Sequence, residues 1–168
     1  MIALKRILVP TDFSEASKAA VKYGVALARV FNAKLHLLHV ETRHDLEIMV
    51  ERELVVRKCL SETPEATSQP NAARELLGTI LAEQEEHDLR PEHVLRASGR
   101  GGTTIEIVRY AKERDIDLIV IGRHGRGFMT HALTGSVAEQ VVRQAPCPVL
   151  IVRHPEHEFV VSDETARQ

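Results

Sequence analysis

The sequence contains no tryptophan, only two tyrosines and four phenylalanines. This scarcity of aromatic side chains removes the stacking platforms on which RNA-binding modules hold single-stranded bases. The chain also lacks an excess of charge of one sign, because 22 basic residues face 24 acidic ones and leave a net charge of −2. No overall field therefore attracts nucleic acid or an anionic membrane, and we expect neither as a partner.

Cysteine and long apolar runs are scarce as well. Cys59 and Cys147 are too few for a disulfide framework and are typical of a protein in a reduced compartment. No stretch approaches the roughly 18 apolar residues that a membrane span needs, and no apolar signal segment follows the first charges. We expect a cytoplasmic protein, and 168 residues fit one domain with a full-sized core.

Common motifs for nucleotides and metals are absent or incomplete. No glycine is followed by lysine, which excludes a Walker A loop. The segment 99–104 resembles a dinucleotide fingerprint, but its last position is not Gly or Ala and no acid ends the next strand. His36 and His39 lie three apart on an expected strand and so face opposite sides of its sheet, and no cysteine stands at a zinc spacing. We assign no metal site to protein side chains.

Short apolar segments alternate with segments of helical periodicity along the chain. We expect strands at 5–10, 34–40, 93–97, 116–121 and 149–152, and helices at 16–31, 45–60, 72–87, 105–111 and 136–145. The polar, proline-bearing stretch 61–71 is expected to be a loop excursion, and 154–168 a flexible tail. This alternation predicts an α/β fold with a doubly wound, five-stranded parallel sheet in a single domain spanning 1–153.

The stretch 122–136, GRHGRGFMTHALTGS, follows an expected strand and precedes an expected helix. Glycines allow backbone N–H groups to approach a ligand closely, and a helix N-terminus adds unpaired donors and the positive end of a dipole. The geometry favours an anion, and phosphate is the obvious one. From the residues alone, the stretch is a phosphate-binding loop.

The spacing within this loop is more specific. Gly122 and Gly125 are separated by two residues, nine more precede Gly135, and Ser136 follows directly. This pattern resembles the ATP-binding signature of the universal stress protein family, and the resemblance extends over residues 5–153. It implies a sheet of strand order 3-2-1-4-5, the adenine nucleotide alpha hydrolase-like fold, with the ends of the first and fourth strands in one crevice. It also implies a homodimer joined through 149–152, which as an apolar edge strand favours pairing in any case.

The resemblance further implies which residues hold a nucleotide. The loop amides and the Ser136 hydroxyl would hold the triphosphate of ATP, accompanied by Mg²⁺, while Asp12 would lie beside the nucleoside and the backbone of Val40 would recognise adenine. The complete candidate set is Pro10, Thr11, Asp12, Val40, Ile121, Gly122, Arg123, His124, Gly125, Arg126, Gly135, Ser136 and Val137.

Other roles are open for some of these residues. Glycines can simply end a strand, and a serine can simply cap a helix. Asp12 can be the N-cap of the first helix, a role compatible with contact to a nucleoside. Arg123, His124 and Arg126 can add charge to a phosphate site or lie solvated in the loop.

The function that follows is a nucleotide-responsive regulator in stress response, whose ATP-bound state a protein partner of unknown identity reads. One alternative is an enzyme that hydrolyses ATP slowly. The sequence offers a phosphate cradle but no evident catalytic base except Asp12. Another alternative is a dimeric scaffold that no longer uses nucleotide.

Overall fold

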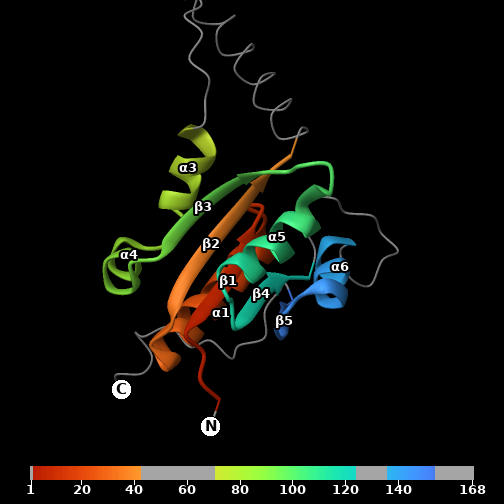
Figure 1. The fold of residues 1–168 in the computed structure, drawn as a ribbon. Coiled ribbons are helices and arrows are strands. Elements are labelled where there is room, and N and C mark those ends of the chain that lie inside the picture. Colours follow the sequence, from red (N-terminus) through yellow and green to blue (C-terminus); the bar gives the residue numbers. More distant parts are fainter. Residues whose placement is uncertain (1, 43–70, 124–135, 154–168) are drawn as a thin grey trace, which may run out of the picture.

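The computed structural model describes residues 2–42, 71–123 and 136–153. Its strands are β1 Arg6–Thr11, β2 Lys34–Glu41, β3 Glu92–Ala97, β4 Leu118–Gly122 and β5 Val149–Val152. They form one parallel sheet in the order β3-β2-β1-β4-β5 (Figure 1). The predicted fold class and strand order are confirmed.

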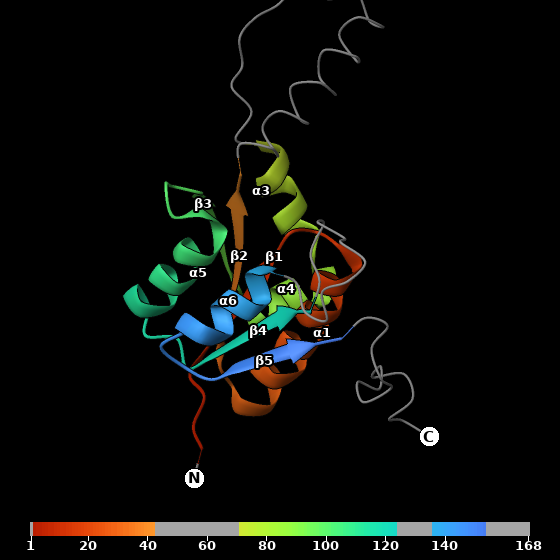
Figure 2. The same cartoon turned by 90° about the vertical axis from the view of Figure 1, so that its right-hand side faces the viewer.

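Helices cover both faces of this sheet. On one face lie α1 Glu15–Phe31, α3 Asn71–Gly78 and α4 Glu83–Leu89, and on the other α5 Gly102–Glu113 and α6 Ser136–Gln144 (Figures 1 and 2). The long helix α1 ends where Asn32 adopts a left-handed conformation with φ of 49°, which its short polar side chain tolerates. The sheet is therefore buried between two helical layers.

The central strands divide their side chains between two apolar clusters. Ile7 and Val9 of β1 pack under α1, whereas Leu8 packs under α5 and α6. The two histidines of β2 divide in the same way. His36 contacts Tyr110 of α5, and His39 contacts the ring of Phe13 in the turn before α1, so their predicted orientation to opposite faces is confirmed.

The helix expected at 72–87 is in fact two helices, α3 and α4, so this prediction is wrong. The first helix ends at Gly78, a poor helix former, and the Thr79 hydroxyl then donates to the carbonyl of Leu76 at 3.2 Å. The second helix begins after Ala82, whose N–H donates to Oε2 of Glu85 at 3.3 Å. The apolar residues keep their helical spacing across the break, so the sequence pattern does not reveal the turn between the two helices.

The fourth strand begins at Leu118 rather than at the expected residue 116. Ile116 is buried, but Asp117 lies outside the ladder, where its Oδ2 accepts the backbone N–H groups of Lys5 and Arg6, both at 2.8 Å. An aspartate therefore ties the beginning of β1 to the beginning of β4.

Two further expectations, the helix at 45–60 and the tail at 154–168, lie outside the described residues, as does nearly all of the excursion at 61–71. Over 2–42, 71–123 and 136–153, no helix combines the length and the apolar character needed to cross a membrane.

Candidate functional site

The carboxyl ends of β1 and β4 lie side by side at the point where the chain reverses direction across the sheet. From β1 the chain continues outward to β2 and β3, and later returns to the other side of β1 as β4 (Figure 2). Open α/β sheets bind ligands outside the carboxyl ends of their strands at such a point. The arrangement brings Thr11 and Asp12 to the same edge as Gly122 and Arg123.

The turn between β1 and α1 is held by its own side chains. The Thr11 hydroxyl accepts the N–H of Phe13 at 3.0 Å, and Oδ1 of Asp12 accepts the N–H of Ser14 at 3.1 Å and its hydroxyl at 2.6 Å. Phe13 has a positive φ of 63°, which is rare and costly for a large aromatic residue. The turn is therefore a strained but tightly bonded segment at the candidate site.

The N-cap of α1 is Ser14, so the alternative role of Asp12 as the N-cap is wrong. Ser14 has extended backbone angles, and its side chain accepts the N–H of Ser17 at 3.3 Å, as an N-cap should. Asp12 lies two residues earlier and holds Ser14 in place. Its carboxylate thus supports the cap indirectly, and the direct capping interaction belongs to Ser14.

A buried histidine and serine support this turn from below, and the sequence predictions did not include them. The Nδ1 of His39 donates to the carbonyl of Thr11 at 2.8 Å, while the ring packs at a tilt against Phe13 with 4.6 Å between centroids. The Ser17 hydroxyl lies 3.1 Å from that of Thr11 and donates to the carbonyl of Ser14 at 2.9 Å. The sequence signal for these two residues is weak, because each is only a polar residue within an otherwise apolar strand or helix face.

Gly122 is required by packing as well as by the loop that follows it. A Cβ atom at this position would lie 2.6 Å from the carbonyl oxygen of Ala16 and 3.0 Å from the nitrogen of Ser17. Real side chains do not tolerate such approaches to backbone atoms, so the first turn of α1 presses directly on the end of β4. The next residue, Arg123, donates its N–H to the carbonyl of Val152 at 2.8 Å.

The structure places the remaining candidates as follows. Pro10, Thr11, Val40 and Ile121 are buried, whereas Asp12, Gly122, Arg123 and Val137 are half-buried. Ser136 is the first residue of α6. Val40 and Ile121 direct their side chains into the core under α5 and α6, so they offer the edge only their backbone. His124, Gly125, Arg126 and Gly135 lie outside the described residues.

The described residues contain no group of three or more histidine, cysteine, aspartate or glutamate side chains that could hold a metal ion. The site offers a carboxylate just after β1 and a close-packed glycine at the end of β4. The next helix in the described part of the chain after β4 is α6, whose first turn begins at Ser136. These elements suit a polar ligand that lies across the edge of the sheet.

Comparison with known proteins gives a consistent result. The model of the universal stress protein family matches residues 3–153. Universal stress protein MJ0531 of Methanocaldococcus jannaschii is 28% identical over 165 residues, which cover 92% of this chain and 85% of the relative.

Solved structures resemble the whole described fold. The structure of MJ0577 from M. jannaschii superposes with a TM-score of 0.65 at 27% identity and covers 91% of this chain and 98% of its own. A universal stress protein crystallised in complex with cAMP has a TM-score of 0.55 at 23% identity, covering 90% of this chain and 98% of its own. The family model spans nearly the entire chain, and we conclude that this protein belongs to the universal stress protein family.

Proposed function

We propose that this protein binds ATP at the carboxyl edge of its sheet and acts as a nucleotide-responsive regulator in stress response. The observation that carries the proposal is the meeting of two chain segments at the switch point: the turn with Asp12 and the end of β4 at Gly122. Family membership supports it, and a family member of the same fold has been crystallised with cAMP, which also carries adenine. The nucleotide would bind within a domain spanning 1–153.

The hydrogen bonds of the turn suggest how such a nucleotide is oriented. The N–H groups of Phe13 and Ser14 are occupied by Thr11 and Asp12, so this turn does not supply free amides to a phosphate. We therefore assign the nucleoside to the end of β1 and the backbone of Val40, and the phosphates to the segment from Ile121 to Val137. Mg²⁺ would arrive with the triphosphate, since protein side chains do not provide an evident metal site in the described ranges.

Regulation is a better proposal than rapid hydrolysis. Hydrolysis requires a residue that orients the attacking water, and Asp12 is the candidate at this edge. Its carboxylate oxygen already accepts two hydrogen bonds from Ser14, which binds it to a structural role. Slow turnover of ATP remains the second candidate function. We also propose a cytoplasmic location, which the low cysteine content supports.

Thermal unfolding with and without Mg-ATP tests the nucleotide site. ATP at a hundredfold excess over its dissociation constant should add about 2.7 kcal/mol to the stability of the folded state. GTP and inorganic phosphate should add much less if the site recognises adenine. The variant Gly125→Val should lose the response to ATP, because a branched Cβ blocks the approach of the backbone to phosphate.

Gly78→Val is a suitable control for this experiment. Gly78 ends α3, and a Cβ atom there would meet nothing within 4 Å, so this variant should respond to ATP as the unmodified protein does. A folded Gly125→Val variant with undiminished ATP affinity would refute the phosphate-binding role of the loop. No response to any nucleotide in the unmodified protein would favour the scaffold alternative.

We further propose a homodimer formed through β5. This strand is last in the strand order, and Leu150 at its centre is 36% exposed, an apolar edge that another copy can cover. Leu150→Lys should convert dimer to monomer in analytical ultracentrifugation, because two lysines would meet across the symmetric interface. Val30→Lys, at an apolar position of α1 that is 77% exposed, should leave the mass unchanged. A monomeric unmodified protein would exclude this interface.

A further inference from the structure

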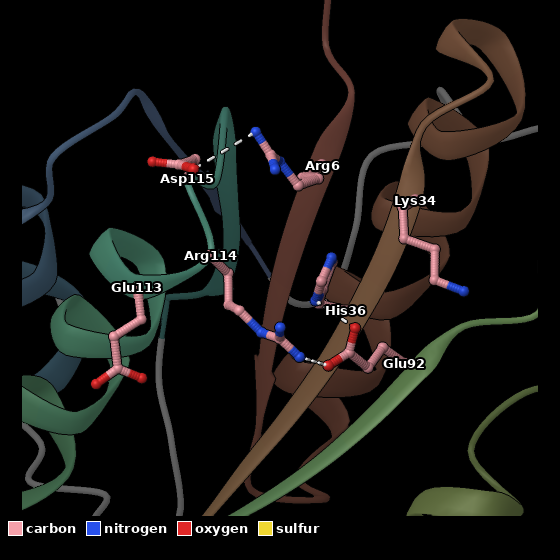
Figure 3. A pocket seen from close by; sticks show the side chains of 7 residues that line it. All are labelled: Arg6, Lys34, His36, Glu92, Glu113, Arg114 and Asp115. Atoms are coloured by element: carbon pink, nitrogen blue, oxygen red, sulfur yellow. Dashed lines mark hydrogen bonds and ion pairs between the residues drawn. The ribbon is translucent and has the colours of Figure 1, made fainter.

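A polar pocket of about 290 Å³ lies at the amino edge of the sheet, opposite the edge that carries Asp12 and Gly122. It is lined by the first residues of β1, β2 and β3, namely Arg6, Lys34 and Glu92, and by Arg114 and Asp115, which follow α5 (Figure 3). At about 3.3 Å per residue, β1 separates the two edges by roughly 16 to 20 Å. The pocket is therefore a separate place from the proposed nucleotide site.

His36 is a buried member of this pocket with one nitrogen unused. Its side chain is 4% exposed, and its Nδ1 lies 2.9 Å from the Tyr110 hydroxyl and 3.6 Å from Oε2 of Glu92. Its Nε2 is buried and has no hydrogen-bond partner in the described part of the chain. An unpartnered buried polar atom destabilises the folded state, so this position favours a ligand with a matching group.

Arg6, on the neighbouring strand, also lines this pocket and carries a second unused group. Its Nε is also buried without a partner among the described residues. Its terminal nitrogen pairs with Asp115 at 3.9 Å, a long and solvent-exposed contact. The guanidinium Nε–H can only donate, so the missing partner must be an acceptor. Figure 3 shows Arg6 and His36 on adjacent strands of this pocket.

The charges around these two groups favour a small anion over a metal ion. Arg6 repels a cation, and its Nε cannot serve as a metal ligand. Glu92 lies behind the His36 ring on the Nδ1 side, so it can stabilise an imidazolium whose Nε2–H then donates into the pocket. Glu92 is itself held by Arg114, and the pocket residue Glu113 by Arg96 at 2.7 Å. Apart from the His36 ring, three basic side chains face three acidic ones in this pocket, so the charge that attracts an anion depends on the proton that His36 takes up.

We propose that this pocket binds a small oxyanion, a phosphate or a carboxylate, between Nε of Arg6 and Nε2 of His36, and that the His36 ring takes up a proton as the anion binds. One oxyanion can accept from both groups at once, which would satisfy the two unpartnered atoms together. The pocket volume of about 290 Å³ leaves ample room for an ion of this size.

The electrostatic surroundings of His36 give the proposal a pH dependence. Burial lowers the pKa of His36 below its ordinary value near 6.5; Glu92 raises the pKa, and Arg114, Lys34 and Arg6 lower it further. Tyr110 also faces the ring, and burial raises its pKa, so its hydroxyl stays protonated at neutral pH. The free ring is therefore neutral at pH 7. Because the anion prefers the imidazolium, its affinity should increase as the pH falls below 7.

The test is an NMR titration of the His36 ring nitrogens in the full chain, in buffers of equal ionic strength containing chloride, inorganic phosphate or acetate. An anion that binds the imidazolium about tenfold more tightly than the imidazole should raise the measured pKa of His36 by about one at saturation. Acetate stays ionised over this range, as a glutamate carboxylate does, and separates a carboxylate preference from a phosphate preference. The readout is at His36 and does not depend on nucleotide binding.

Arg6→Gln should abolish the effect of the anion, because it removes the cationic donor. Arg143→Gln, an exposed arginine paired with Glu139 on α6, should retain it. Identical His36 titrations in chloride, phosphate and acetate would overturn the proposal, and this comparison needs no variant. A full response in folded Arg6→Gln would also overturn it.

Discussion

Replacement of Gly122 by alanine is expected to lower the free energy of unfolding by about 3 kcal/mol, at the upper end of the usual cost of overpacking. The new methyl group would lie 2.6 Å from the carbonyl oxygen of Ala16 and 2.7 Å from its carbonyl carbon. Backbone atoms of a first helical turn cannot rotate away as a long side chain can. Relief therefore requires α1 to move away from β4. Urea unfolding followed by circular dichroism measures the loss.

Gly78→Ala is the matched control for this experiment. It adds the same methyl group to a helical glycine with open space around it, and should be neutral or stabilising by about 0.5–1 kcal/mol. A Gly122→Ala variant as stable as the unmodified protein would show that α1 does not press on β4. Because α1 also carries the cap below Asp12, the variant should bind nucleotide weakly for structural reasons. Gly125→Val is accordingly the cleaner test of the phosphate loop.

Replacement of Tyr110 by alanine should destabilise the protein by about 3–5 kcal/mol, as expected for a large buried ring. Tyr110 of α5 is 1% exposed and packs in the cluster between the sheet, α5 and α6. Its hydroxyl lies 2.9 Å from Nδ1 of His36 and 3.3 Å from Oε1 of Glu92, so its loss also leaves a buried histidine nitrogen without this partner. Equilibrium unfolding in urea measures the total.

Tyr110→Phe separates the two contributions. It keeps the ring and removes the hydroxyl, so its cost should be about 1–3 kcal/mol, the penalty of an unsatisfied buried partner. Equal losses for the alanine and phenylalanine variants would mean that packing of the ring contributes nothing. A loss below about 1 kcal/mol for alanine would contradict the buried position of the side chain.

Local pattern predicted the elements well because buried strands and amphipathic helices have distinct periods. The run at 35–40 is continuously apolar apart from its histidines, and it forms most of a central strand, β2. The order of the strands in the sheet could not be predicted from local pattern. Periodicity does not say which strands are neighbours, and the order 3-2-1-4-5 came from the resemblance to a family.

The details that sequence reasoning missed depend on contacts between distant residues. Asp117 accepts N–H groups from residues more than 110 positions away, and nothing near it in the sequence indicates that role. The loop motif identifies Gly122, yet the close approach of Ala16 gives this glycine a packing role that no motif predicts. A histidine in the position of His39 suggests metal binding from the sequence, whereas its actual partner is the carbonyl of Thr11.

The tie between Asp117 and the beginning of β1 has a consequence for synthesis on the ribosome. The hydrogen bond from Arg6 to Asp117 joins residues 111 positions apart, and β4 follows Asp117 directly. At about 5–20 residues per second, β1 emerges roughly 5 to 20 seconds before the neighbour that completes it. During that interval the central strand of the future sheet has one open apolar edge. Folding of the nascent chain can therefore be completed only after the last third of the protein has been made.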